Sequence, residues 1–173
     1  MTPTTPKPLR HITASEFARR LNIDLSTQDK RYAFFLGSGC SVTSGIKTAG
    51  QLVTDEWLPK LRNIMAPEES DHEAWGSKKF GYDAKAPAAS YGVMMKELFL
   101  QSEEQQREIE RLCDNKFPAF GYSVLAELMQ QTKSNGTFNV VLTTNFDDLV
   151  ADALYLFTSI RPLIIHHESL AGY

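Results

Sequence analysis

Two short segments of the 173-residue sequence combine residue types that could bind a phosphorylated ligand and act on it. The first, Gly37-Ser38-Gly39-Cys40-Ser41, follows the apolar run Arg31–Leu36. Glycines let backbone amides approach a phosphate closely, and the two serine hydroxyls can add donors. The segment is not a standard nucleotide motif. Val42 stands where the dinucleotide fingerprint needs a third glycine, and Ile46 stands where a P-loop needs lysine.

The second segment, Thr143-Thr144-Asn145-Phe146-Asp147-Asp148, follows the apolar run Phe138–Leu142. The amide of Asn145 can donate and accept hydrogen bonds at once, and the carboxylate of Asp147 can orient a loop or favour a nearby cation. Either residue could instead serve as a helix cap. Ligands of parallel sheets bind at the carboxyl ends of the strands, so we expect the two segments to line one crevice.

The rest of the sequence indicates the elements that position these segments. Apolar runs bounded by turn residues predict buried strands over Arg31–Leu36, Phe138–Leu142 and Leu163–Ile165. Apolar periodicity and capping patterns predict helices over Thr13–Leu21, Thr48–Met65, Tyr91–Leu100, Ser102–Cys113, Tyr122–Gln131 and Phe146–Phe157. Strands without polar alternation, separated by helices, are typical of an α/β fold. We expect a Rossmann-like doubly wound parallel sheet with helices on both faces.

The domain organisation follows from composition along the chain. Residues 1–12 carry three prolines among threonines and read as a flexible tail, and residues 13–173 read as one domain. Residues 66–89 are rich in charge, Gly, Pro and Ala, and read as a mobile insertion or lid, or as a partly helical segment. The last residues start like a helix, so we expect the C-terminal part of the domain to be missing from this chain.

Overall composition excludes several classes of function. A net charge of −3 and a pI near 5.8 give no bulk attraction to nucleic acid or to an anionic membrane. No apolar run approaches the roughly 18 residues of a membrane span, and the polar start is not a signal peptide. Cys40 and Cys113 cannot form a disulfide framework or a four-cysteine zinc site, and His166-His167-Glu168 lacks the second histidine of a zincin. We therefore expect a cytoplasmic protein without a bound metal.

Taken together, the two segments resemble those of the sirtuin-like superfamily. That superfamily has a Gly-x-Gly-x-Ser loop followed by Ser-Gly-Ile, here Ser44-Gly45-Ile46, and later a Thr-x-Asn-x-Asp loop. The resemblance extends from about Arg31 to the end of the chain. Deacylase sirtuins continue with Pro-Asp-Phe-Arg, where this chain has Lys47-Thr48-Ala49-Gly50, and they carry Gln at the position of Thr144. The sequence looks more like the sirtuin-like NAD+ hydrolase domains of bacterial anti-phage defence proteins.

This resemblance implies a substrate, NAD+, and cleavage of its nicotinamide–ribose bond. It implies that Asn145 is catalytic and that Asp147 orients the loop or favours the cationic transition state. It implies that the substrate is bound by Gly37, Ser38, Gly39, Ser41, Thr143, Thr144 and Asp147, with the glycine-loop amides on the pyrophosphate and the threonines at the ribose. It also implies a homo-oligomer with an attached or partner sensor domain, whose activation leads to NAD+ depletion.

Two other functions compete with the hydrolase. One is a non-catalytic module that binds NAD or ADP-ribose and regulates an attached domain, and the other is a sirtuin-type protein deacylase. The general base is also open: His166 and His167 lie 21 and 22 residues after Asn145, close to the spacing in deacylase sirtuins, but Glu168 follows them instead of glycine. We expect the catalytic histidine to lie beyond Tyr173, so that this chain alone binds NAD+ weakly and hydrolyses it little.

Overall fold

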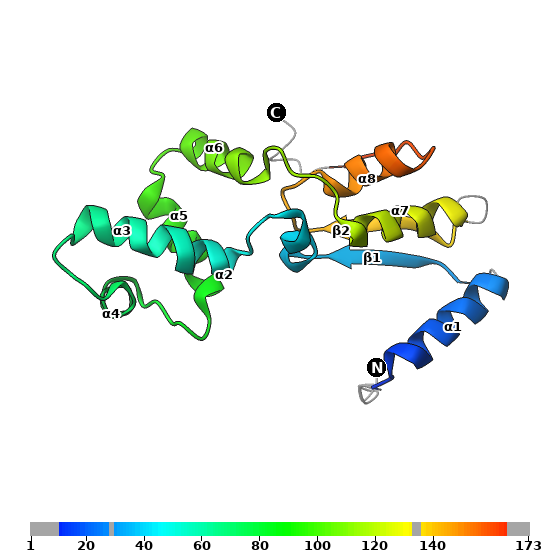
Figure 1. Cartoon of the computed structure of the whole chain (residues 1–173), viewed down its shortest axis with the longest axis horizontal. Coiled ribbons are helices and arrows are strands. Elements are labelled where there is room, and N and C mark those ends of the chain that lie inside the picture. The colour runs from blue at the N-terminus through cyan, green and yellow to red at the C-terminus, as the bar shows by residue number, and fades with distance from the viewer. Residues whose placement is uncertain (1–10, 28–29, 133–135, 166–173) are drawn as a thin grey trace, which may run out of the picture.

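The computed structural model describes residues 11–27, 30–132 and 136–165, and these form an α/β fold (Figure 1). They contain eight α-helices and two strands. The elements, in chain order, are α1 (Ala14–Thr27), β1 (Tyr32–Leu36), η1 (Ser38–Ser44), α2 (Ala49–Leu52), η2 (Val53–Trp57), α3 (Leu58–Met65), α4 (His72–Phe80), η3 (Pro87–Ser90), α5 (Tyr91–Leu98), α6 (Ser102–Cys113), α7 (Phe120–Gln131), β2 (Phe138–Thr143) and α8 (Leu149–Phe157).

The two strands are parallel neighbours, as the sequence predicts. Leu36 pairs with Thr143, so both strands end at the same edge of the sheet. One face of the sheet packs against α7 and α8, and Phe34 and Phe138 stack there with their ring centroids 5.1 Å apart. The buried residues of this cluster are Tyr122, Leu125, Ala126, Met129, Phe138, Leu149, Ala153 and Leu154.

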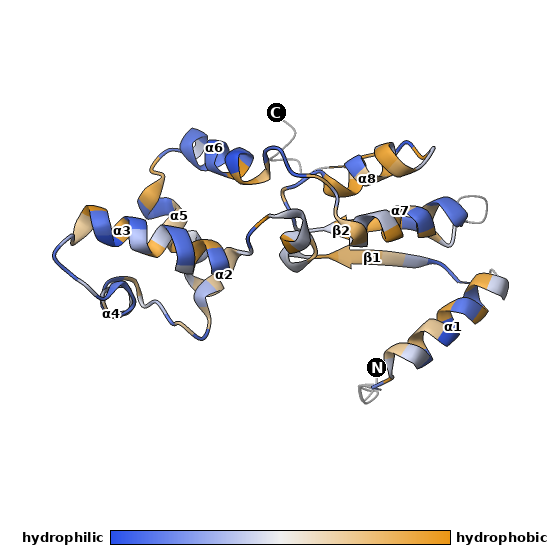
Figure 2. Cartoon of the chain, in the orientation of Figure 1, coloured by the Kyte–Doolittle hydropathy of each residue, from blue (hydrophilic) through white to orange (hydrophobic). Residues whose placement is uncertain are grey.

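The other face of the sheet is uncovered within the described residues, contrary to our expectation of strands buried on both sides. Phe35 is 73% exposed and its register partner Leu142 is 52% exposed. Figure 2 shows β1 as hydrophobic along its length, so both of its faces are apolar. The prediction that the strands are buried on both sides rests on their apolar side chains on both faces. Burial of the second face also requires other elements that pack against it.

The prediction of a third strand over Leu163–Ile165 is wrong. These residues follow α8 without regular structure, and the Leu163 and Ile165 side chains are 86% and 82% exposed. A short apolar run forms a strand only when a neighbouring backbone pairs with it, and the sequence alone does not supply that neighbour. The described residues therefore form an α/β fold with a two-stranded sheet, and a doubly wound sheet is not observed among them.

A second core lies among the helices between the strands. Residues 49–65 form the predicted long helix, capped at Thr48 by a capping box with Gln51. The helix widens to a π-helical turn over Val53–Trp57, which ends two residues before Pro59, a residue with no N–H to donate. The chain thus passes a proline without a break. The buried residues of this core are Leu52, Val53, Trp57, Leu58, Leu61, Tyr82, Met94 and Met95.

The segment 66–89 contains the helix α4, which packs against α3. Gly76 permits this close approach, because a Cβ at that position would lie 2.5 Å from a Leu58 methyl carbon. The helix α6 begins as predicted, but its capping box joins Gln101 and Glu104, one residue earlier than the Ser102 pattern indicated.

The helix α1 extends six residues beyond its predicted end at Leu21 and is tied to β1. The carboxylate of Asp24, which is 8% exposed, accepts hydrogen bonds from Lys30 and from the Tyr32 hydroxyl. Most of the expected N-terminal tail lies outside the described residues. In the part of the chain that the structure describes, no helix has the length and hydrophobicity to cross a membrane.

Candidate functional site

The two polar segments meet at the carboxyl edge of the sheet. The backbone N–H of Thr144 donates to the carbonyl oxygen of Leu36 at 3.2 Å, which extends the strand pairing by one step. The side-chain amide of Asn145 then donates to the carbonyl oxygen of Gly37 at 3.2 Å and to Ser41 Oγ at 2.9 Å. The predicted juxtaposition of the segments is confirmed.

Ser41 is the centre of this cluster and is only 1% exposed. Its Oγ lies 2.7 Å from Asp147 Oδ2, 2.8 Å from the Tyr122 hydroxyl and 2.9 Å from Asn145 Nδ2. A carboxylate can only accept, so the Ser41 hydroxyl donates to Asp147 and accepts from Asn145 and Tyr122. The hydroxyl is fully used inside the protein. Of the two serines expected to donate to a ligand, only Ser38 is exposed.

Asn145 presents an acceptor that nothing in the described residues satisfies. Its Nδ2 faces the Gly37 carbonyl, which needs a donor, and this fixes the orientation of the amide. Its Oδ1 is therefore the opposite atom, buried and without a hydrogen-bond donor among the described residues. Leaving such an atom unsatisfied costs about 1–3 kcal/mol, which a bound hydroxyl or water would recover.

Asp147 and the threonines shape the second loop. The other oxygen of Asp147, Oδ1, accepts from the backbone N–H of Leu149, the first residue of α8, at 3.3 Å, so Asp147 is bonded both to the start of the helix and to Ser41. The helix therefore begins three residues later than the predicted Phe146. Thr143 Oγ1 accepts from the backbone N–H of Asn145 at 3.0 Å, and the side chains of Thr143 and Thr144 are exposed.

The glycines of the first loop leave open space above the backbone. A Cβ at Gly37 or Gly39 would have no protein atom within 4 Å. Neither glycine has positive φ, in contrast to Gly45 (φ 83°), which ends η1. Packing and backbone conformation thus do not require glycine at positions 37 and 39, although glycine costs conformational entropy on folding. A physical reason for glycine at both positions is that it leaves the backbone accessible to a group from outside the chain.

Tyr122 also belongs to the cluster, and no sequence motif indicates its role. It is 3% exposed, and burial, followed by the nearby charge of Asp147, raises the pKa of its hydroxyl. The phenol therefore stays protonated and donates to Ser41 at neutral pH. From sequence it is one apolar position at the start of a helix. The one available signal is that a tyrosine hydroxyl, when buried, usually needs a hydrogen-bond partner.

A hollow of about 680 Å³ lies beside the second loop. Phe146, which is 61% exposed, and Asp148 form one wall. The helix α6 and the residue after it form the other wall, which includes Gln106, Arg107, Ile109, Glu110, Arg111, Cys113 and Asp114. Burial raises the pKa of the Cys113 thiol. Among residues 11–27, 30–132 and 136–165, no three His, Cys, Asp or Glu side chains gather in a metal-binding group.

The expected general base is not placed by the structure. His166 and His167 lie outside the described residues. His72 opens α4 in the helical core, and His11 precedes α1. Neither of these two histidines is hydrogen-bonded to the cluster around Asn145.

No protein-family model matches this chain, and no curated protein matches its sequence. The resemblance to sirtuin-like proteins therefore depends on the two loop motifs of the sequence alone.

Proposed function

We propose that this chain is a sirtuin-like NAD+ glycohydrolase domain that cleaves the nicotinamide–ribose bond. The observation that supports it best is the Asn145 side chain, which is held by both loops and carries a buried acceptor without a donor among the described residues. The acceptor lies beside a glycine loop that is open to an incoming group. In this proposal a ribose hydroxyl donates to that acceptor while the adjacent pyrophosphate lies against the glycine loop.

The proposed reaction breaks the bond between C1′ of the ribose and N1 of the nicotinamide. The electron pair of that bond goes to N1, which neutralises the pyridinium ring and leaves positive charge on the ribose. The oxygen of a water molecule then bonds to C1′ and releases a proton. Asn145 Oδ1 accepts a hydrogen bond from the ribose hydroxyl or the water and fixes its position. Ser41, Asp147 and Tyr122 are positioning residues, because they hold the Asn145 amide without facing the substrate.

Substrate binding is assigned to the rims of the two loops. The backbone amides of Ser38 and Gly39 at the start of η1, with the exposed hydroxyl of Ser38, face the pyrophosphate in this proposal, because the Cys40 N–H already donates to the Gly37 carbonyl oxygen. The exposed Thr143 and Thr144 line the ribose. The proposal includes a Rossmann-like doubly wound sheet in which β1 and β2 are neighbours. The uncovered apolar face of these strands supports it, because parallel sheets are normally covered on both faces.

The biological role in this proposal comes from the motif resemblance. The domain acts in the cytoplasm as the effector of an anti-phage defence system, works as a homo-oligomer with an attached or partner sensor domain, and depletes NAD+ when the sensor is triggered.

The test is nicotinamide release from NAD+ by the 173-residue chain at high enzyme concentration, compared with Asn145→Ala. We expect Asn145→Ala to lower the rate by about 100-fold or more, the usual cost of losing one preorganised polar group. Asn139→Ala is the matched control, because Asn139 is an exposed asparagine on the neighbouring strand β2. Measurable release that is equal in the wild type and in Asn145→Ala, with both folded by circular dichroism, would remove Asn145 from the reaction and contradict the proposal.

A non-catalytic NAD or ADP-ribose binding module is the second candidate. It is favoured by one observation: neither His11 nor His72, the histidines within the described residues, is bonded to the Asn145 cluster. Calorimetry separates the two functions. A binding module takes up NAD+ without releasing nicotinamide, and Asn145→Ala then weakens binding instead of turnover.

A further inference from the structure

The two loops of the proposed site contain no lysine, arginine or histidine. A dinucleotide diphosphate is a dianion, but the glycine loop offers it only neutral backbone amides and a serine hydroxyl. The second loop adds the carboxylates of Asp147 and Asp148. Because like charges repel, an anionic ligand at this place needs a nearby cation to offset those carboxylates.

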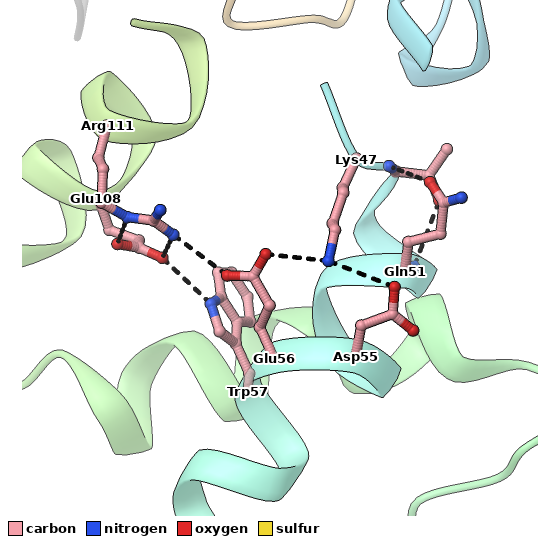
Figure 3. A network of polar contacts seen from close by, with 8 residues as sticks. Lys47, Gln51, Asp55, Glu56, Trp57, Glu108 and Arg111 are labelled. Atoms are coloured by element: carbon pink, nitrogen blue, oxygen red, sulfur yellow. Dashed lines mark hydrogen bonds and ion pairs between the residues drawn. The ribbon is translucent and has the colours of Figure 1, made fainter. Parts of the chain in front are cut away.

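Lys47 is the first cation along the chain after the glycine loop, but it is held by other residues (Figure 3). Its ammonium forms ion pairs with Glu56 at 3.1 Å and with Asp55 at 3.4 Å. Arg111 pairs with the same Glu56 carboxylate at 3.2 Å and with Glu108 at 2.7 Å. Both cations are therefore paired with carboxylates of the helices between β1 and β2.

Lys116 is a second lysine beside η1. It lies in residues 114–119, which join α6 to α7 (Figure 1). The backbone N–H of Ala119 donates to Ser44 Oγ at 3.0 Å, which ties this segment to the end of η1. The side chain of Lys116 covers Gly45, because a Cβ at that glycine would lie 3.7 Å from Lys116 Nζ.

The ammonium of Lys116 has no partner among the described residues. No carboxylate, carbonyl or hydroxyl group in residues 11–27, 30–132 and 136–165 forms an ion pair or a hydrogen bond with it, although the side chain is half-buried. Burial disfavours a charge that is neither paired nor hydrogen-bonded. A half-buried, unpaired ammonium therefore points to an anion that comes from outside the described residues.

Short contacts connect this ammonium to the Asn145 site. The backbone N–H of Gly45, over which Lys116 lies, donates to the carbonyl oxygen of Ser41, one turn back along η1. The side chain of Ser41 in turn accepts from Asn145 Nδ2 at 2.9 Å. The cation thus lies about one turn of η1 from the residue that holds the Asn145 amide.

The charges around Cys113 place Lys116 beside the second loop as well. Burial raises the pKa of the Cys113 thiol, and so do the charges of Asp147 and Asp148. The charge of Lys116 lowers it. The ammonium and the carboxylates therefore act on one thiol from nearby positions, and the ammonium offsets the field that would repel an anionic ligand.

We propose that Lys116 is a ligand-binding residue of the Asn145 site, whose ammonium pairs with the diphosphate of the bound dinucleotide. This inference rests on the proposed function, which supplies the dianion. Lysine suits the role because its ammonium is a compact charge on a flexible stem, which can turn from Gly45 toward a phosphate while the backbone stays in place. The amides of Ser38 and Gly39 orient the diphosphate, and Lys116 supplies the charge.

The test measures the affinity of the 173-residue chain for ADP-ribose, which contains the diphosphate, by NMR titration of isotope-labelled protein. We expect Lys116→Gln to weaken binding by about fivefold, the upper end for a partly exposed ion pair. Lys116→Arg keeps the charge and should keep most of the affinity. Raising the salt concentration from about 0.05 M to about 0.5 M should weaken binding to the wild type more than to Lys116→Gln, because salt screens the ion pair.

Lys47→Gln and Arg107→Gln are the matched controls, because each removes one positive charge near the site. Lys47 belongs to the network of Figure 3, and Arg107 is an exposed residue in the wall of the hollow beside Phe146. Both variants should bind ADP-ribose within about twofold of the wild type. Equal losses in all three variants would indicate general attraction by positive charge and would overturn the assignment to Lys116.

A structural role for Lys116 predicts a different result. A cation beside the last carbonyl groups of a helix stabilises that end, so Lys116→Gln would then lower the stability toward urea and leave the affinity unchanged. Unchanged affinity overturns the binding role, whatever the stability. A wild-type chain that does not bind ADP-ribose at all would instead contradict the proposed function, and the role of Lys116 with it.

Discussion

The side-chain amide of Asn145 donates to the backbone carbonyl of Gly37 across 108 residues of sequence, at a distance of 3.2 Å. This bond joins the loops that follow the two strands. It depends on the strand register, which brings Leu36 beside Thr143 and so starts both loops at one place. The position of the amide is therefore a property of the sheet rather than of either loop alone.

Replacing Ser41 with Ala should destabilise the protein and loosen the site. The change leaves the Asp147 carboxylate and the Tyr122 hydroxyl without their Ser41 partner, at a cost of about 1–3 kcal/mol of unfolding free energy. Urea denaturation followed by circular dichroism measures it. Ser38→Ala is the control, because Ser38 is exposed, and we expect a change within about 0.5 kcal/mol. Equal stability of the two variants would show that the Ser41 hydroxyl does not hold the cluster.

Replacing Gly39 with Leu should weaken NAD+ binding more than folding. The new side chain meets open space in the protein, but it occupies the region through which a pyrophosphate would approach the backbone. Calorimetry should show at least about a tenfold loss of affinity, equivalent to 1.4 kcal/mol. Gly92→Leu on α5 also places a side chain in open space and should leave the affinity unaltered. Unchanged affinity in Gly39→Leu would remove the phosphate role from this loop.

The stabilisation that Asp24 provides by anchoring α1 should be lost at acidic pH. Hydrogen bonds from Lys30, and then from Tyr32, lower the pKa of the Asp24 carboxyl below its ordinary value of about 3.9. The unfolded chain then binds the proton more readily than the folded one. The stabilisation by Asp24 is complete above about pH 4 and is lost as pH falls through the lowered pKa. Asp24→Asn should therefore lose more stability, relative to wild type, at pH 6 than at pH 3. A difference between the two proteins that is the same at both pH values would contradict this.

The sequence identified the elements whose signal is local. The apolar runs before Gly37 and Thr143 predicted both strands, and the rule that parallel strands end at one edge predicted that their loops would meet. The sequence only partly indicates which residue holds the Asn145 amide in place. Ser41 was expected to face a ligand, but it lies inside, because Tyr122 approaches it from a helix 81 residues away.

Features that depend on a neighbouring layer were not predictable. The run Leu163–Ile165 has strand composition, but no backbone pairs with it in the described residues. Phe35 and Leu142 have the composition of a buried face, and no element among those residues covers them. The separation of the two cores was also hidden, because apolar periodicity shows which face of a helix is buried but not against which partner.

A crystal structure of the chain with NAD+ or ADP-ribose would test the central claim most directly. The account predicts that Asn145 Oδ1 gains a hydrogen bond from a ribose hydroxyl or a bound water, and that the diphosphate lies against the backbone amides of Ser38 and Gly39. A ligand bound elsewhere, with Asn145 Oδ1 still without a donor, would contradict it.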